Sequence, residues 1–489
     1  MPSVIRSASP RHTGITKFTN CRLVRGDELV WDDVWVSSAT GKILRSQSAF
    51  YDELIMPDEV VDLGGRIVSP GFIECQLNGA YGFNFSTIAD DMAQYGKQLR
   101  DLNRKLAQTG VTSYVPTVTS QTSELYKRVL PYLGPSGASR CAQEGAESLG
   151  AHVEGPFLNP ARNGVHNPSA LRVASSLSDL EDMYGATNIT PSPSSFHRQK
   201  PSQEESEGED DESSLPSPDQ QHGNNDTIPI KMITVAPELG SMTSLIPALV
   251  SRGVIVSIGH SEATYEQASA AVAAGATMIT HLFNAMRPLH HRDPGIFGVL
   301  GAPDRSSDYS TSPAHESPSP SRPAGPRPYF GLIADGIHLH PATVKIAWHA
   351  HPAGLVLVTD AMHMVGLPDG RYPWTNGEGE HFIVKRGNVL ELEGTGGVIA
   401  GSSITLVDCV SNFLNYTGAT IPEALRAVTA TPAAMLGVQR VKGCLDAGAD
   451  ADLVVLSERS EDGGKRELVV DEVWKFGIKI FERGSDKIV

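Results

Sequence analysis

Three residues of this chain combine the types and positions that metal-assisted hydrolysis requires. Glu154 ends the apolar run LGAHVE, while His260 and His281 each follow an apolar run of their own, VIVSIG and TMIT. Two imidazoles and one carboxylate form a catalytic zinc set that leaves a fourth coordination position for water. A bound divalent ion lowers the pKa of that water towards roughly 7. We therefore predict that Glu154, His260 and His281 bind a metal ion.

A further carboxylate can carry the proton transfer of such a hydrolysis. Asp360 directly follows the apolar run LVLVT. A carboxylate at this position can take a proton from the attacking water and hand it to a leaving amine. The alternative interpretation is that Asp360 caps the next helix. The presence of the metal trio favours catalysis.

Other histidines suit the polarisation of a carbonyl group. His338, which follows Asp335 in the segment IADGIHLHP, can donate a hydrogen bond to a substrate carbonyl or its oxyanion. His340 is its rival, because spacing alone does not choose between the two. His166, in ARNGVHNPSALR, can reach over the pocket, although taken alone it is more typical of a surface histidine.

The segment THLFNAMRPLHHRDPG is basic within an acidic chain. This contrast suggests that it binds a phosphate or a carboxylate, although a solvated loop is the alternative. The candidate contacts are Asn284, the backbone amides around Ala285, Arg287, His290, His291 and Arg292.

Eight short apolar runs, most of them separated by helical stretches, must position these residues. The runs are Ile67–Ile73, Val111–Val115, Leu149–Val153, Met232–Ala236, Val254–Ile258, Thr277–Thr280, Phe330–Ala334 and Leu355–Thr359. This alternation is typical of an α/β fold, the (β/α)8 TIM-like barrel, in which catalytic groups lie at the C-terminal ends of the strands. Thr117 and Glu238 also follow runs of this kind, without an assigned role.

The two ends of the chain differ from the barrel pattern. Residues 14–66 and 439–489 contain short strands, and we expect them to form one small β-sandwich domain beside a barrel spanning 67–438. Two inserts, at about 191–227 and 302–328, are rich in Ser and Pro, so we expect them to be disordered. Each lies between a helix and the next strand, which is the side of a barrel away from its active site.

Composition limits the partners and the compartment. The chain has 489 residues and a net charge of −16, which argues against a nucleic acid partner. The five cysteines are scattered and form no CxxC pair, which favours a reducing cytoplasmic location. The sequence shows neither a secretory signal nor a run long enough to span a membrane, so we expect no membrane association.

Several blocks, in order, carry a resemblance to a known family. They include PGFIECQLNGAYGFNFS, HVEGPFLNPARNGVHN, SIGHSEATYEQA, THLFNAM, RDPGIFG, IADGIHLHP, LVTDAM, GVIAGSSITL and KGCLDAGADADLVVL. In these blocks the chain resembles the N-acetylglucosamine-6-phosphate deacetylases of the amidohydrolase superfamily. The likeness covers nearly the whole chain except the two inserts. It implies hydrolysis of the acetamide of a phosphosugar, N-acetyl-D-glucosamine 6-phosphate, in amino-sugar catabolism.

The resemblance also assigns roles to individual positions. It implies a metal ion held by Glu154, His260 and His281, Asp360 as general base and acid, and His338 as the residue that polarises the acetamide carbonyl. It further implies a homodimer in which Arg292 reaches the phosphate in the neighbouring site. The remaining substrate contacts that it implies are His166, Asn284 and Ala285.

The end of the first run indicates how many metal ions bind. Many members of the superfamily carry His-x-His there and hold a second ion, whereas this chain has Gln76 and Asn78. Neutral amides are poor ligands for a divalent cation beside imidazoles, so we expect one ion. We expect zinc, although the ligand set also suits Fe2+ or another divalent ion. The alternatives are an amidohydrolase acting on another N-acyl sugar or a cyclic amide, and a catalytically inactive scaffold homologue.

Overall fold

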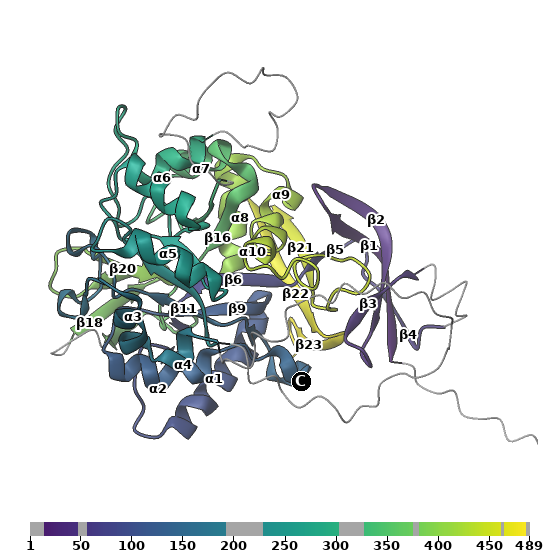
Figure 1. Ribbon diagram of the computed structural model, residues 1–489. Helices are drawn as coiled ribbons and strands as arrows, with labels where there is room; N and C mark the ends of the chain where they lie inside the picture. The colour runs from purple at the N-terminus through teal and green to yellow at the C-terminus, as the bar shows by residue number, and fades with distance from the viewer. Residues whose placement is uncertain are drawn as a thin grey trace, which may run out of the picture.

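The computed structural model describes residues 14–46, 56–191, 228–302, 327–374, 381–460 and 464–485 (Figure 1). The two predicted inserts, 191–227 and 302–328, lie outside the described residues apart from a few positions at their edges. None of the helices in the described part of the chain is long and apolar enough to cross a bilayer.

Eight parallel strands form the barrel. Each strand pairs with the next in chain order, from β6 to β16, and the short strand β10 (Glu147–Ser148) is added beside β9. A parallel bridge between Leu77 and Ala361 connects the last strand region back to the first. The predicted (β/α)8 TIM-like barrel is therefore confirmed. Its strands are β6 (Phe72–Leu77), β9 (Val111–Val118), β11 (Ala151–Glu154), β12 (Ile230–Val235), β13 (Ile255–Ile258), β14 (Met278–Ile279), β15 (Tyr329–Ile333) and β16 (Leu355–Val358).

Helices surround the barrel, and their apolar residues face it. In α6, Thr264 and Gln267 form a capping box, and the helix ends at Gly275 in a left-handed conformation. This helix connects the strands that precede His260 and His281. The helices are α1 (Met92–Leu106), α2 (Ser123–Leu133), α3 (Leu177–Tyr184), α4 (Ala186–Ile189), α5 (Met242–Ser251), α6 (Tyr265–Ala274), α7 (Pro341–Ala350), α8 (Leu406–Thr417), α9 (Ile421–Arg426) and α10 (Ala430–Met435).

Both ends of the chain build one β-domain beside the barrel. In Figure 1 its purple N-terminal strands lie next to its yellow C-terminal strands. The strand order is β23-β22-β21-β5-β1-β2-β3, and β4 pairs with β1. Phe18 and Trp474, from opposite ends of the chain, make an edge-to-face contact in its core. The strands are β1 (Ile15–Arg25), β2 (Glu28–Ser37), β3 (Lys42–Leu44), β4 (Glu59–Asp62), β5 (Ile67–Pro70), β21 (Leu453–Ser460), β22 (Arg466–Lys475) and β23 (Ile478–Glu482).

The first predicted run, Ile67–Ile73, is not one barrel strand. It is divided at Gly71, so that β5 pairs with β1 and β21 of the β-domain while β6 enters the barrel. A Cβ at Gly71 would lie 2.1 Å from the Thr112 hydroxyl, so the crossing requires glycine. The run is continuous in hydrophobicity because both halves are buried.

A buried group of charged residues joins the two parts. The Lys475 ammonium lies 2.6 Å from Glu147 of the barrel and 2.8 Å from Asp452 of the β-domain. Lys442 contacts the same two carboxylates and lies 2.8 Å from Asp450. We call Glu147, Lys442, Asp450, Asp452 and Lys475 the junction cluster.

An antiparallel sheet that the sequence analysis did not predict follows β16. Its strands lie in the order β17-β18-β19-β20. The strands β7 and β8, which follow β6, form a separate two-stranded hairpin. The alternating segment HFIVKRGNVLEL, with Gly387 at its turn, is a hairpin signal that was available in the sequence. The strands are β7 (Gly79–Ala80), β8 (Phe83–Asn84), β17 (Gly370–Trp374), β18 (His381–Arg386), β19 (Val389–Leu392) and β20 (Ile399–Ser402).

Candidate active site

One cavity of about 240 Å³ at the C-terminal ends of the barrel strands contains most of the predicted site residues. Segments far apart in the sequence therefore meet there, as the barrel topology requires. The predicted residues that line it are Glu154, His166, His260, His281, Asn284, Ala285, His338 and Asp360.

The three predicted metal ligands lie at mutual distances that suit a metal ion. Glu154 Oε1 is 3.0 Å from His281 Nε2 and 3.2 Å from His260 Nε2, and the two ring nitrogens are 3.1 Å apart. Ligand atoms at about 2.0–2.1 Å from a tetrahedral zinc ion lie about 3.3–3.4 Å from each other. The trio therefore fits such an ion with small adjustments.

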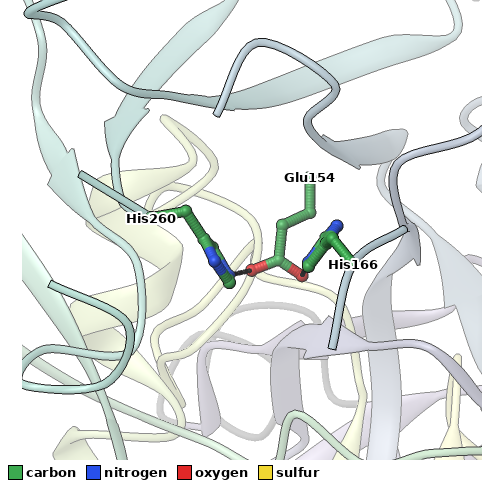
Figure 2. A group of neighbouring side chains, drawn as sticks. All are labelled: Glu154, His166 and His260. Atoms are coloured by element: carbon green, nitrogen blue, oxygen red, sulfur yellow. Dashed lines mark ion pairs between the residues drawn. The ribbon is translucent and has the colours of Figure 1, made fainter. Parts of the chain in front are cut away.

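Hydrogen bonding distinguishes His260 from His166. His260 Nδ1 lies 2.7 Å from the Arg162 carbonyl, to which it donates, so its Nε2 lone pair is free to bind a cation. His166 Nδ1 accepts a hydrogen bond from the Ser120 amide at 3.1 Å, so a neutral His166 carries its proton on Nε2. His166 therefore presents a donor to the cavity, although it lies near Glu154 and His260 (Figure 2). The interpretation of His166 as a surface histidine is wrong, because it is only 4% exposed.

The surroundings in the cavity shift the pKa values of Glu154 and Asp360 in opposite directions. Burial alone would raise the pKa of Glu154, but its close contacts with the His260 and His281 rings hold that pKa well below its usual range. Burial, and then the negative charge of Glu154, raise the pKa of Asp360. Two carboxylates with pKa values displaced in opposite directions can take separate roles as ligand and as acid or base.

Two amide side chains connect these carboxylates. Gln76 Nε2 lies 3.0 Å from Glu154 Oε1 and 3.2 Å from Asp360 Oδ1. Asn78 Nδ2 donates to Asp360 Oδ1 at 2.7 Å. Amide donors at the end of β6 thus hold both carboxylates from the side where other members of the superfamily are expected to bind a second ion.

The choice between His338 and His340 follows from their contacts. His338 Nδ1 lies 2.6 Å from Asp335 Oδ2, and the Asp335 carboxylate also accepts hydrogen bonds from the amides of Ile337 and His338. His338 lines the cavity. His340 is the exposed N-cap of α7, and its ring accepts a hydrogen bond from the Ala342 amide. Its geometry is that of a structural residue.

Sharp turns follow the barrel strands at the site. His260, His281, Ala285 and Asp360 all have positive φ angles, between 24° and 48°. This conformation is unfavourable for residues with a side chain and persists where the surrounding contacts enforce it. His260, His281 and Asp360 each lie two positions beyond the end of a barrel strand, and Ala285 follows a few residues after His281 in the same loop. The turns bring all four residues into one cavity.

The predicted anion contacts are divided in space. Asn284 and Ala285 line the cavity, whereas Arg287 pairs with Asp293 at 3.1 Å. Arg292 is exposed on the loop that follows, outside the residues lining the cavity, as are the neighbouring histidines 290 and 291. Arg292 therefore does not line the cavity of its own chain.

One wall of the cavity was not predicted from the sequence. Met362, Trp374 and the segment 398–401 line it from β17, β20 and the turn after β16. Their type gave no chemical signal, because they are mostly apolar.

Comparison with known proteins agrees with this fold. The amidohydrolase family profile matches residues 67–478. The chain belongs to the amidohydrolase family.

Within the family, the chain is similar to N-acetylglucosamine-6-phosphate deacetylases. It is 39% identical to N-acetylglucosamine-6-phosphate deacetylase of Danio rerio over 446 residues, which cover 91% of this chain and 93% of that protein. It is 38% identical to the human N-acetylglucosamine-6-phosphate deacetylase over 452 residues, covering 91% and 92% respectively. The Mycobacterium smegmatis N-acetyl-D-glucosamine-6-phosphate deacetylase, solved as a mutant with N-acetyl-D-glucosamine-6-phosphate, superposes with a TM-score of 0.66 at 26% identity, covering 95% of this chain and 98% of that one.

Proposed function

We propose that this chain hydrolyses the acetamide of N-acetyl-D-glucosamine 6-phosphate, giving D-glucosamine 6-phosphate and acetate. The observation that carries the proposal is the single cavity in which Glu154, His260 and His281 converge beside Asp360 and His338. The similarity to deacetylases over nearly the whole chain supports the same substrate.

Glu154, His260 and His281 would hold one divalent ion, and zinc suits two imidazoles and a carboxylate. When bound, this ion would supply hydroxide at neutral pH and polarise the acetamide carbonyl. Gln76 and Asn78 support a single ion, because their amide groups donate hydrogen bonds to the carboxylates nearby.

The chain's own residues would then move the protons. Asp360 would take the proton of the attacking water on its carboxylate and deliver it to the amide nitrogen as the C–N bond breaks. His338, held at Nδ1 by Asp335, would donate from Nε2 to the carbonyl oxygen as negative charge develops there. His166 would donate from Nε2 to a substrate oxygen.

The phosphate end of the substrate would lie against Asn284 and the amide of Ala285. We propose a homodimer in which Arg292 of a second copy of the chain completes this phosphate site. The exposed position of Arg292 outside its own cavity supports that arrangement. A planar guanidinium suits a phosphate because it can donate two hydrogen bonds at once.

We propose the domain boundaries 14–66, 67–438 and 439–489, with β5 as the strand on which the chain passes from the β-domain to the barrel. The cytoplasmic location stays a prediction, supported by five cysteines that are free thiols.

The decisive experiment compares acetate release from N-acetyl-D-glucosamine 6-phosphate with release from the unphosphorylated sugar, with metal content measured in the same sample. We expect release from the phosphorylated sugar only, with about one ion per active chain. Equal rates on the two sugars would contradict the phosphate site. Two tightly bound ions would contradict the single-ion assignment.

A further inference from the structure

The Glu238 carboxylate, just past β12, receives hydrogen bonds from two separate segments. Oε1 accepts from the Asn159 side chain at 2.8 Å and from the Glu262 amide at 2.7 Å, while Oε2 accepts from the Ser261 hydroxyl at 2.7 Å. Glu238 is not among the residues that line the cavity. Its contacts are therefore directed at the loops on either side of it.

One of these loops is the turn that presents His260. Ser261 and Glu262 directly follow this histidine, whose φ of 48° is unfavourable for a residue with a side chain. Two hydrogen bonds from the turn to one carboxylate offset that cost. Glu238 thereby restrains the direction in which the imidazole leaves β13.

The other loop contacts both the backbone and the ring of His260. The Asn159 amide donates to the His260 carbonyl at 2.9 Å, and the Arg162 carbonyl accepts from His260 Nδ1 at 2.7 Å. An ion pair between Arg162 and Glu262 connects the two loops again. His166 and Gly164 follow on this loop, and a Cβ at Gly164 would lie 3.3 Å from the His260 ring.

We propose that Glu238 is a positioning residue that fixes His260 and the 159–166 segment relative to each other. It thereby increases the affinity of the site for its metal ion. The inference rests on the proposed metal site. Hydrogen-bonded partners of metal-binding histidines fix the tautomer and the ring orientation, and their loss typically lowers metal affinity about 10- to 100-fold.

The test is Glu238→Gln, which keeps the size of the side chain but places an NH2 group against donors. Zn2+ affinity is measured on the metal-free full-length protein by competition with a chromogenic chelator. We expect the Zn2+ Kd to rise about 10- to 100-fold. The matched control is Glu266→Gln, which makes the same charge change at an exposed position in the first turn of α6 and should leave the Kd unchanged.

A Kd for Glu238→Gln within twofold of the original protein would overturn the proposal. So would a lower unfolding temperature of the metal-free variant with an unchanged Kd, because that combination indicates a purely structural role. If this variant does not fold, Ser261→Ala is tested instead, because it removes one of the three hydrogen bonds to Glu238. Ser261→Ala should raise the Kd about 2- to 10-fold. An unchanged Kd in this second variant would also overturn the proposal. The Kd is measured without substrate, so a failure of acetate release would count against the proposed reaction alone.

Discussion

The cavity and the junction cluster both gather buried carboxylates, yet they are suited to different tasks. In the cavity, the partners of Glu154 are imidazoles, which can release their protons and offer lone pairs to a cation. In the junction cluster, the ammonium groups of Lys442 and Lys475 already occupy the space between the carboxylates. Both sites contain three potential ligand atoms close together. The difference shows that the cationic partner, more than the number of acids, separates a metal site from a structural ion network.

The largest effect is expected at Asp360, the proposed catalytic acid and base. Asp360→Asn keeps the size of the side chain but removes the proton acceptor, so kcat should fall about 100- to 10,000-fold. Metal content, measured in the same preparation, should stay at the level of the original protein because Asp360 is not among the three proposed ligands. A variant with near-normal kcat would refute the role of Asp360.

At the junction cluster we expect a change of similar size, but in the free energy of unfolding rather than in catalysis. Lys475→Met removes a fully buried cation and leaves Lys442 as the one buried ammonium group facing Glu147 and Asp452 among the described residues. Breaking a buried ion pair by removing one partner destabilises a protein by about 3–5 kcal/mol. Urea unfolding measures this change, while kcat of the folded fraction should change less than twofold.

Lys17→Met is the control, because Lys17 pairs with Asp33 outside the junction cluster and the two side chains are 27% and 34% exposed. A Lys475 variant that is fully stable but inactive would contradict the view that the junction cluster serves stability while the cavity serves catalysis.

Glu74 is a buried carboxyl group for which the described residues provide neither an imidazole nor an ammonium partner. Its hydrogen-bond donors are the amides of Gln76 and Thr359, and burial raises its pKa to about 8. A raised pKa in the folded state favours the protonated form, so the stability it contributes is complete below about pH 4.5 and is lost as the pH rises through 8. Glu74→Gln should therefore reduce the loss of stability between pH 5 and 9, by on the order of a few kcal/mol.

The free energy of unfolding at both pH values measures this effect. Glu124→Gln is the control, because the side chain of Glu124 is 74% exposed. Identical pH dependence in the Glu74 variant and the original protein would show that the buried carboxyl is already ionised, and hence that partners are not needed to keep a buried acid charged here.

The smallest effect is expected at the exposed end of the site. Arg292→Ala should raise KM for the phosphorylated sugar about 10-fold with little change in kcat, since a hydrogen bond to a charged group contributes about 1.5–3 kcal/mol. Arg100→Ala, on the exposed face of α1, is the control. An unchanged KM would argue against the contact between copies, which sedimentation of both variants tests independently.

The strand ends were predictable because parallel strands direct their C-terminal residues to one edge. Glu154, His260, His281 and Asp360 follow buried runs, and this was enough to expect them together. The contacts of His338 and His166 depend on Asp335 and Ser120, and the Ser120 contact joins separate loops, which neither periodicity nor spacing reveals.

An uninterrupted apolar run also concealed the boundary between the β-domain and the barrel. The run from Ile67 to Ile73 is apolar throughout, because its two halves are buried in different sheets. Glu238 had no assigned role for a related reason, since its function depends on hydrogen bonds to loops distant in the sequence.

The pairing of β5 with β21 has a consequence for the order of synthesis. Every barrel strand and every residue of the cavity is translated before β21 exists, so one edge of β5 has no partner while the ribosome completes the chain. An unpaired strand edge is a template for association with other chains. A chain interrupted before Leu453 would therefore contain all the proposed catalytic residues and still be prone to aggregate through the β5 edge.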